Sequence, residues 1–596
     1  MRKIIYIVFI VLLFAKVTIS ATVYVDSDCS NGISTYAPGS AGSGGTCTGG
    51  SDTVYSTIAN AVAGISGTGN IIYMRTGTYN EYNIDIPEST NGTSWGASNH
   101  NTLASFPGEW AVIDGSGAGT GEVIRHVTGH SGSGSNPTKY WKFERFEIDC
   151  SSEAQHAFLF TAGPIWIRYM YIHDLLYPGS GDDLVAAIWI NVSTQSIIEY
   201  NYFKDVSATS PTTNVRHIAF DADQKDNTSN DGNGEEFDPD VCVNRNIVRY
   251  NYISGGVTGI HPKAQQRYGY NDRNPNGMSD YEEWGDKYHH NVVLGTSGAS
   301  IVANSDFTNI YNNIVDGTIE SEANKHIPQI YNHVIYNNTT VGGNSEDPSY
   351  YITSGINTGG EGLAYNNYYD DGDQYTVHPH IWMFNNISSG TGSGYHELPY
   401  LVIWDMPSDS SNPDTDQSDL VIENNLIHDA DLDDAIIVGR LVSGTGCDHY
   451  LKTVAEFNAC SDTWRSTSGV TNWDINTAGL FVGGGGANDY ITVGSYVISG
   501  ATTIANGGKG GAHPYRSGVT IPSYVGATNP DDNSWVAGVM AMDVDYFTSQ
   551  TAGSDPTWIE GESEPEVPAN AIQGMQISNI GVTNNLIAWH RTDGLR

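Results

Sequence analysis

The chain has 596 residues, with 67 Asp and Glu against 26 Lys and Arg, and a formal net charge of −41. Such a negative surplus excludes nucleic acid as a partner, because binding to phosphates is driven by Lys and Arg. It also repels other polyanions unless cations bridge the two surfaces.

The N-terminus has the pattern of a secretion signal. Arg2 and Lys3 precede an apolar run over residues 4–15, and small residues up to Ser20 precede Ala21. This order predicts a signal peptide over residues 1–20. The run is too short for a comfortable membrane span and no later stretch replaces it, so we expect a secreted or cell-surface protein without a membrane span.

Six cysteines in an exported chain favour disulfides over metal ligation. Cys29 with Cys47 would close one local loop, and Cys447 with Cys460 another. Cys150 and Cys242 then remain as a pair by elimination only. No Cys-x-x-Cys spacing indicates zinc.

The first elements of the mature chain are predicted to be strands with one helix. Residues 22–26 read as a strand, followed by a Gly/Ser-rich loop that encloses Cys29 and Cys47. Residues 56–65 carry apolar side chains at helical spacing, which suits a helix that covers the open end of a solenoid. Strands are expected at 71–79 and 111–115.

A short phrase built on asparagine recurs between Ile197 and Ile387. Aligned on its first Asn, the step from Asn291 to Asn312 is 21 residues and the step from Asn312 to Asn332 is 20. Repeats of about 20 residues are typical of solenoids. The phrases lie in runs rich in Ile, Val and Tyr, and few of the gaps look helical, which favours a parallel β-helix. We therefore expect Asn251, Asn291, Asn312 and Asn332 to stack directly above one another with paired amides.

The mature chain begins with a strand, a Cys loop and a short helix. These are followed by Ile71-Ile72-Tyr73-Met74-Arg75-Thr76-Gly77-Thr78-Tyr79, then by Val112-Ile113-Asp114-Gly115-Ser116-Gly117, and then by the Asn-marked coils. This order resembles that of secreted bacterial proteins of the pectate-lyase-like superfamily. The resemblance covers about residues 22–430. It implies an all-β fold: a right-handed parallel β-helix with a short N-terminal capping helix and an irregular C-terminal closing block. It does not fix an activity, because the architecture hosts lyases, hydrolases, esterases, tailspikes and adhesins.

The resulting domain prediction has five parts. They are a signal peptide (1–20), a parallel β-helix with its N-terminal cap (21–440), an irregular closing region (441–553), an acidic linker rich in Pro and Glu (554–570), and a strand-like tail (571–596).

Two insertions interrupt the repeats between Asn201 and Asn291, and the second, residues 261–288, is the candidate catalytic stretch. Three cations, Lys263, Arg267 and Arg273, fall within eleven residues of a chain that is poor in cations. β-Helix lyases of the resembled superfamily remove the proton next to a uronate carboxylate, which requires a base and an electrostatic clamp. The resemblance thus suggests Lys263 as base and Arg267 as clamp. Substrate-binding candidates are His261, Tyr268, Tyr270, Arg273 and Trp284. The competing interpretation is a solvated, ion-paired loop.

The first insertion, residues 221–240, is acidic. Calcium takes six to eight oxygen ligands, and the candidate ligands here are Asp221, Asp223, Asp226, Asp231, Glu235, Glu236 and Asp238. Ca²⁺ bound there would allow an acidic protein to act on an acidic polysaccharide. A hydrated cluster of Asp/Gly turns is the alternative.

Three functional hypotheses follow. The leading one is a polysaccharide lyase that cleaves a uronate polymer by β-elimination. The second is a non-catalytic adhesive or fibre-forming surface protein that self-associates through residues 571–596 by strand addition. The third is a glycoside hydrolase with opposed carboxylates, for which Asp182-Asp183 and Asp221/Asp223 are candidates. The signature motifs of polygalacturonases and of pectate lyases proper are missing from the sequence.

Overall fold

The computed structural model describes residues 21–96, 98–126, 139–160, 164–179, 184–191, 196–210, 214–221, 246–262, 286–303, 308–321, 330–341, 350–353, 378–389, 401–404, 419–423, 425–428, 436–438, 450–452, 474–476, 481–482, 491–492, 497–498, 510–512, 519–528 and 534–550.

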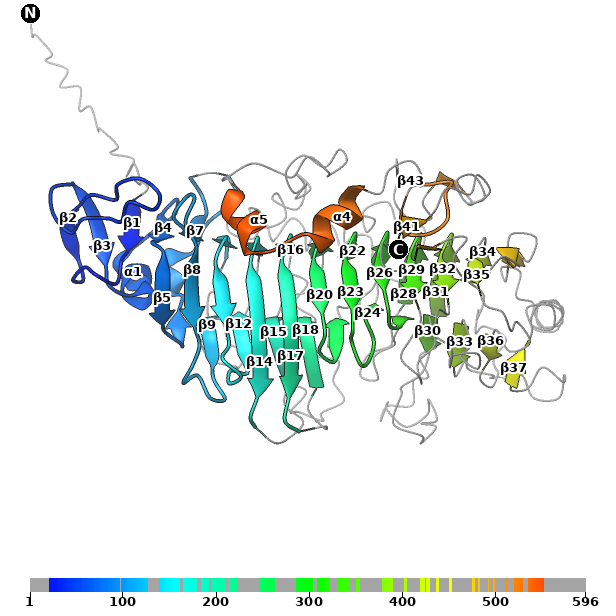
Figure 1. Cartoon of the computed structure of the whole chain (residues 1–596). Coiled ribbons are helices and arrows are strands. Elements are labelled where there is room, and N and C mark those ends of the chain that lie inside the picture. Colours follow the sequence, from blue (N-terminus) through cyan, green and yellow to red (C-terminus); the bar gives the residue numbers. More distant parts are fainter. Residues whose placement is uncertain are drawn as a thin grey trace, which may run out of the picture.

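Three long sheets of 15, 12 and 12 strands run along the molecule (Figure 1). From β4 to β36, successive strands of the chain enter the first, second and third sheet in turn, so each of these strands pairs with its counterpart one coil away. Within these sheets, β2–β3 and β36–β37 are the antiparallel pairs among the described strands. The other pairings are parallel, and this arrangement confirms the predicted parallel β-helix.

The first sheet contains, in spatial order, β2 (Ile33–Tyr36), β3 (Asp52–Tyr55), β1 (Thr22–Val25), β4 (Ile71–Met74), β7 (Asn101–Ser105), β10 (Trp141–Glu144), β13 (Ile165–Arg168), β16 (Ile197–Glu199), β19 (Ile247–Arg249), β22 (Lys287–His289), β25 (Asn309–Tyr311), β28 (Ile330–Tyr336), β31 (His378–Phe384), β34 (Asp419–Glu423) and β38 (Asp474–Asn476). The second contains β5 (Gly77–Asn80), β8 (Ala111–Asp114), β11 (Glu147–Asp149), β14 (Tyr171–Tyr177), β17 (Tyr202–Ala208), β20 (Tyr252–Ser254), β23 (Val292–Leu294), β26 (Ile314–Val315), β29 (Thr339–Val341), β32 (Ile387–Ser389), β35 (Leu426–His428) and β39 (Phe481–Val482). The third contains β6 (Ile84–Asp85), β9 (Glu122–His126), β12 (His156–Phe160), β15 (Leu184–Asn191), β18 (Asn214–Asp221), β21 (Thr258–Ile260), β24 (Ile301–Ala303), β27 (Ile319–Ser321), β30 (Tyr350–Thr353), β33 (Leu401–Trp404), β36 (Ile436–Val438) and β37 (Tyr450–Lys452). Two small hairpins pair β40 (Ile491–Thr492) with β41 (Val497–Ile498) and β42 (Gly511–Ala512) with β43 (Thr520–Ile521).

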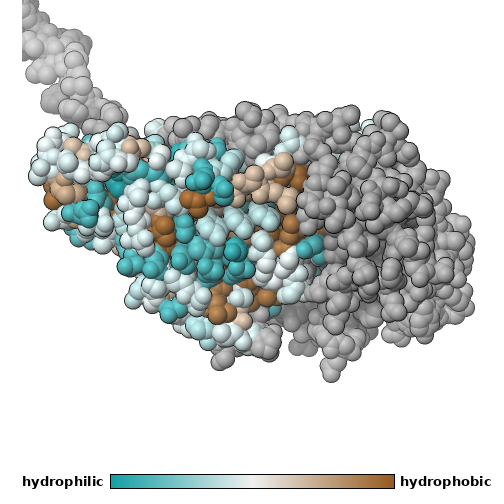
Figure 2. All heavy atoms as spheres, viewed as in Figure 1, coloured by the Kyte–Doolittle hydropathy of each residue, from teal (hydrophilic) through white to brown (hydrophobic). Residues whose placement is uncertain are grey.

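The surface on the face shown in Figure 1 is mostly hydrophilic over the described residues, and its hydrophobic patches are small and separate (Figure 2). Among the described residues, no helix has the length and apolarity that crossing a membrane requires.

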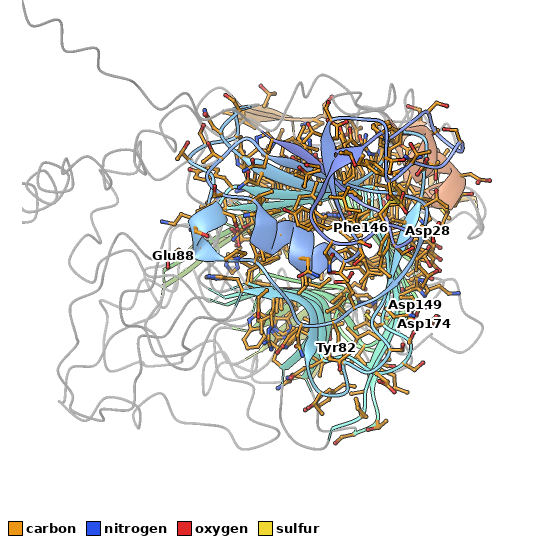
Figure 3. All side chains as sticks on the ribbon, turned by 90° about the vertical axis from the view of Figure 1, so that its left-hand side faces the viewer. Asp28, Tyr82, Glu88, Phe146, Asp149 and Asp174 are labelled. Carbon is orange, nitrogen blue, oxygen red and sulfur yellow. A yellow bond between two sulfur atoms is a disulfide. The ribbon has the colours of Figure 1, made fainter. Side chains whose placement is uncertain are left out.

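The predicted N-terminal helix is present as α1 (Ile58–Gly64), and it lies across the end of the solenoid (Figure 3). Thr57 caps it by accepting a hydrogen bond from the Asn60 N–H, and the Glu81 carboxylate accepts from the Ile58 N–H at 2.7 Å. Both interactions satisfy N–H groups that a helix start leaves unpaired. Ile58, Ala61 and Val62 are buried against the first coils, so α1 covers what would otherwise be an open apolar end.

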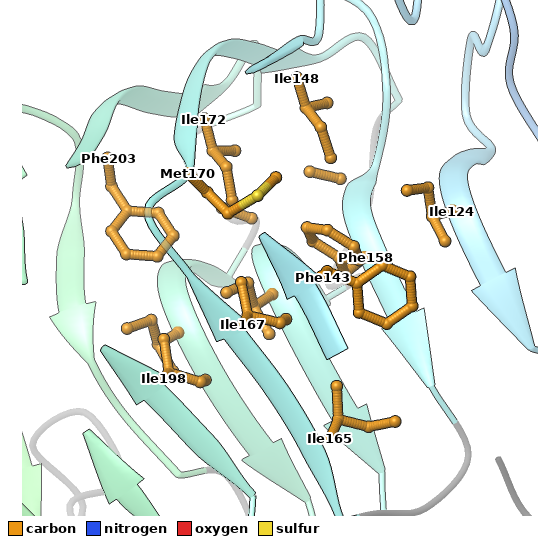
Figure 4. Packing of buried hydrophobic residues seen from close by; sticks show 14 of the residues in the cluster. Ile124, Phe143, Ile148, Phe158, Ile165, Ile167, Met170, Ile172, Ile198 and Phe203 are labelled. Carbon is orange, nitrogen blue, oxygen red and sulfur yellow. The ribbon is translucent and has the colours of Figure 1, made fainter. Parts of the chain in front are cut away.

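The inside of the solenoid is filled by apolar side chains from all three sheets. Figure 4 shows part of it, with Phe143 and Phe158 facing each other and Ile167 lying beside Ile198. The Phe143 and Phe158 rings lie 5.2 Å apart, edge to face. These residues are fully buried, which is the main favourable term for a fold whose surface is this polar.

An asparagine ladder marks the corner between the first and second sheets. Each amide Nδ2 donates to Oδ1 of the next member at 2.9–3.0 Å, and each Oδ1 also accepts from the backbone N–H of the preceding member. The members are Asn201, Asn251, Asn291, Asn313, Asn338, Asn386 and Asn425. The ladder itself was predicted, but two of its members were misassigned: Asn313 belongs to it instead of Asn312, and Asn338 instead of Asn332.

The replacement of Asn312 by Asn313 in the ladder follows from the backbone conformation at the corner between the first and second sheets. Among the described residues, those before a ladder position have a positive φ of 52–56°: Tyr200, Tyr250, His290, Asn312, Asn337 and Asn385. In a Tyr-Asn-Asn phrase the first Asn therefore takes the strained turn position, which Asn tolerates well, and the second enters the ladder. Asn332 lies inside β28 instead. The true spacings between members vary from 22 to 50 residues, because the loops between coils differ in length.

The residues before the ladder are covered by a return segment, which we define as residues 519–528 and 534–550. It includes α4 (Ser534–Met540) and α5 (Val544–Ser549), which lie along one edge of the solenoid (Figure 1). Asn385 donates to the Pro522 carbonyl at 3.0 Å, and Asn312 donates to the Tyr524 hydroxyl at 2.8 Å. Trp535 packs on His290 with ring centroids 5.0 Å apart. This segment therefore runs back toward the N-terminal coils and closes their flank.

Of the predicted disulfides, Cys29–Cys47 is present. Cys150 is a buried free cysteine, so the pairing with Cys242 reached by elimination is wrong. The physical reason is its position, since Cys150 packs inside the hydrophobic core of the solenoid. Cys242, Cys447 and Cys460 lie outside the described residues.

Candidate functional site

Both predicted insertions begin at the same edge of the third sheet. The acidic one starts where β18 ends at Asp221, and the mixed one starts at His261, directly after β21. These two strands are parallel neighbours, with Ile218 opposite Ile260, and the His261 N–H donates to the Ile218 carbonyl at 2.9 Å. The register places His261 opposite Ala219, so the mixed insertion starts on the strand next to β18, one strand spacing (~4.8 Å) to the side and two residues before the level of Asp221.

The outer face of the third sheet beside this edge is lined by polar and aromatic side chains. Trp189 of β15 lies against His156 of β12, with ring centroids 5.0 Å apart. The next strand carries Arg216, which is buried and whose Nη1 donates to the His261 carbonyl at 3.0 Å. Arg216 thus fixes the backbone at the point where the mixed insertion begins.

His217 points into the solenoid interior, in contrast to Arg216. Its Nδ1 donates to the Thr258 carbonyl at 2.8 Å, and its Nε2 has no hydrogen-bond partner among the described residues. Burial lowers the pKa of His217 to about 4, because a desolvated imidazolium is unfavourable. This histidine is neutral at physiological pH and supports the site without reaching its surface.

The structure describes two of the residues predicted from the sequence for binding or catalysis. His261 lies at the start of the mixed insertion and Asp221 at the last position of β18. The others lie outside the described residues: Asp182, Asp183, Lys263, Arg267, Tyr268, Tyr270, Arg273, Trp284, Asp223, Asp226, Asp231, Glu235, Glu236 and Asp238.

A second charged cluster lies on the outer face of the first sheet. The strand register places Glu144, Arg168, Glu199 and Arg249 in one row with alternating charge. Arg168 Nε lies 2.9 Å from Glu144 Oε2, and Arg249 Nη2 lies 2.8 Å from Glu199 Oε2. All four residues are at most 5% exposed. Neighbouring coils are thereby joined by buried ion pairs.

The ionisation of this row follows from its geometry. Burial opposes the charge on Glu144, but Lys142, Arg168 and Arg145 outweigh it and lower the pKa of Glu144 to about 2. Burial also lowers the pKa of Lys142, and the nearby arginines add to that effect. The row is closed to solvent, so we interpret it as a structural feature of the coils.

Sequence reasoning missed Trp189, Arg216 and the His156 ring. Their signal was a polar or large aromatic residue at an outward position within a strand that is otherwise apolar, such as Val215-Arg216-His217-Ile218. The alternation of apolar and polar residues does not identify these outward positions by itself. In β15 and in β18 two successive residues point inward, and both pairs, Ala187 with Ile188 and His217 with Ile218, are fully buried.

No protein-family model matches the chain, and no curated protein matches it significantly. Among solved structures, it is similar to the PL6 family alginate lyase AlyGC, at 10% identity and a TM-score of 0.32, over 62% of this chain and 50% of that one. The chain thus matches about half the length of that enzyme.

Two further similar structures were found. One is a PL6 family polysaccharide lyase from Pseudopedobacter saltans, at 14% identity and a TM-score of 0.32, over 65% of this chain and 92% of that one. The other is the pectate lyase Pel9A, at 11% identity and a TM-score of 0.28, over 86% and 96%. The strand pairing of this chain, and not these similarities, establishes its fold.

Proposed function

We propose that the protein is a secreted polysaccharide lyase that cleaves a uronate-containing polymer by β-elimination. The observation that supports this proposal most is that β18, which ends at Asp221, and β21, which His261 follows directly, are neighbouring parallel strands. An acidic and a cation-rich insertion that leave neighbouring strands provide both kinds of group that the reaction needs at one place on a rigid sheet.

In this reaction Lys263, as the neutral amine, takes the proton from the sugar carbon next to the carboxylate. The electron pair then forms the carbon–carbon double bond as the adjacent carbon–oxygen bond to the next sugar breaks, and the released sugar oxygen takes a proton from water. Arg267 neutralises the carboxylate, whose charge grows in the enolate-like transition state. The Arg216 contact with the His261 carbonyl at 3.0 Å holds the start of this insertion in place.

Calcium is the proposed cofactor of the acidic insertion. Its carboxylates, beginning with Asp221, are the ligand type that Ca²⁺ prefers. A bound Ca²⁺ would offset part of the net charge of −41 where an anionic polymer approaches.

The test is an assay of the purified chain with a panel of uronate polymers in the presence of Ca²⁺, following the ultraviolet absorbance of the unsaturated product. Lys263→Met is expected to lower kcat by about 100-fold or more, the usual effect of removing a general base. Chelation of Ca²⁺ should raise KM for the polymer.

Arg125→Gln is the matched control. Arg125 lies on the same sheet, in β9, and pairs with Asp85 at 2.7 Å on the surface, where ion pairs contribute little. This variant should keep full activity. New reducing ends without unsaturation would indicate a glycoside hydrolase instead, and no product from any polymer would reject catalysis of this type.

A further inference from the structure

A compact group of potential metal ligands lies on the outer face of the second sheet, away from the site described above. The strand register pairs Asp149 of β11 with His173 of β14, and Asp174 follows His173 in the chain. One ligand atom from each of the three residues lies within 4.8 Å of the others. Asp149 and Asp174 are seen close together at the flank of the solenoid (Figure 3).

The imidazole of His173 is held in a fixed orientation. Its Nε2 lies 3.0 Å from Oε1 of Glu147, and the other oxygen of that carboxylate accepts a hydrogen bond from Trp110 Nε1 at 2.9 Å. Tyr171 stacks on the ring with centroids 4.2 Å apart. A carboxylate on one ring nitrogen is the usual support for a histidine whose other nitrogen binds a metal.

The other nitrogen, Nδ1, contacts Asp174. It lies 2.8 Å from Oδ2 of Asp174, whose side chain is 50% exposed and so has room to adjust around an ion. Oδ1 of Asp149 accepts from the Ser151 N–H at 2.7 Å, while no described residue donates to Oδ2 of Asp149. One nitrogen and two carboxylates with open oxygens therefore converge, and His173 itself is only 8% exposed.

The next coil provides a natural comparison. Lys204 lies opposite His173 in the register, and Asp205 follows it as Asp174 follows His173. The two aspartates share the same left-handed backbone, with φ of 54° and 55°. In that coil, however, a cation replaces the imidazole, and Lys204 lies 3.7 Å from Asp205. The backbone feature is thus repeated, but the ligand set occurs in one of the two coils.

We propose that Asp149, His173 and Asp174 bind a divalent transition metal of the zinc type, with Glu147 as the hydrogen-bond acceptor that orients His173. Zn²⁺ accepts mixed imidazole and carboxylate ligands, with water in the remaining position, whereas Ca²⁺ and Mg²⁺ require oxygen ligands. The ion would link β11 to β14 and thereby two successive coils. This site is independent of the proposed lyase activity.

The experiment is a titration of the chelator-treated full chain with ZnCl₂, read by calorimetry and by the thermal unfolding midpoint, with CaCl₂ in parallel. We expect Asp174→Asn, a change at a half-exposed side chain, to remove one Zn²⁺ from the binding stoichiometry. Glu147→Gln should keep the site but weaken it by about 10-fold or more. Asp205→Asn is the matched control and should bind Zn²⁺ as the wild type does.

His173→Gln should remove the same Zn²⁺ if the variant folds. Unchanged stoichiometry and affinity in Asp174→Asn would overturn the proposal. So would a His173→Gln variant that loses stability but binds Zn²⁺ like the wild type, because the group would then be ion-paired only. Equal competition by Ca²⁺ for this site would also contradict the assigned class of metal.

Discussion

The side-chain amide of Asn251 donates a 3.0 Å hydrogen bond to Oδ1 of Asn291, forty residues further along the chain. The same oxygen accepts from the Asn251 N–H at 3.1 Å, and both residues are fully buried. A buried amide is costly unless its donors and acceptors are paired, and here the stacking of coils pairs them. The ladder therefore makes the register between coils specific, because a displaced coil would leave these groups unpaired.

Replacing Asn291 by Leu should destabilise the solenoid strongly. The change removes the acceptor of both Asn251 donors, and each orphaned buried group costs about 1–3 kcal/mol. Denaturation in urea, followed by circular dichroism, measures the loss. Asn80→Ala is the control, since Asn80 is exposed in β5 and a surface change is expected within about 0.5 kcal/mol. Equal stabilities of the two variants would contradict the role of the ladder.

The buried His217 should make stability depend on pH. Its pKa is lowered to about 4 in the folded chain, against about 6.5 when unfolded. Below pH 6.5 the unfolded state binds the proton and the folded state does not, so stability falls as the pH drops from 6.5 to 4. The loss amounts to about 3 kcal/mol for a shift of this size.

His217→Gln keeps a donor for the Thr258 carbonyl but cannot titrate. Urea midpoints measured between pH 4 and 7 should therefore decline less steeply for this variant than for the wild type. Asn80→Ala, at an exposed position of β5 that does not titrate, serves as the control and should retain the wild-type slope. Parallel curves for His217→Gln and the wild type would exclude the burial effect.

Trp535 anchors the return segment to the solenoid. It is 7% exposed and packs against His290 and Tyr250. Trp535→Ala should weaken this docking by about 3–5 kcal/mol, the usual cost of truncating a buried aromatic residue. We expect faster proteolytic cleavage of the return segment while the β-sheet circular dichroism is retained.

Tyr82→Ala is the comparison for that experiment, because Tyr82 is 47% exposed. It should leave the cleavage rate of the return segment unchanged. If Trp535→Ala is cleaved no faster than Tyr82→Ala, the segment is held by other contacts and the anchoring role of Trp535 is wrong.

The Cys29–Cys47 disulfide should stabilise the N-terminal cap. It closes a loop with a sequence separation of 18, for which the restriction of the unfolded chain gives about 3 kcal/mol. A Cys29→Ser/Cys47→Ser variant should unfold at a lower temperature than the wild type in scanning calorimetry. Added reductant should lower the wild-type midpoint and leave that of the variant unchanged; an equal response of both would assign the effect to another disulfide.

The candidate site was predictable only in part. The clustering of cations from Lys263 and of carboxylates from Asp221 is visible in the sequence, as is the position of both stretches between repeats. That the stretches leave adjacent strands depends on which residues of β18 and β21 pair, and insertions of unequal length hide this in the sequence. The group around His173 was missed because Asp149 and His173 meet across two coils, 24 residues apart in sequence and adjacent only in the register.

The sequence by itself determined the architecture, because apolar strand residues, turn residues and repeated asparagines are local signals that recur in every coil. It also located the helix over Ile58–Gly64 and one disulfide. Only the tertiary structure decided which asparagine of each pair enters the ladder, since the choice depends on the left-handed turn at Asn312 and its equivalents. The same holds for the burial of Cys150 and for the return segment on the flank, because contacts between distant parts of the chain leave no periodic trace in the sequence.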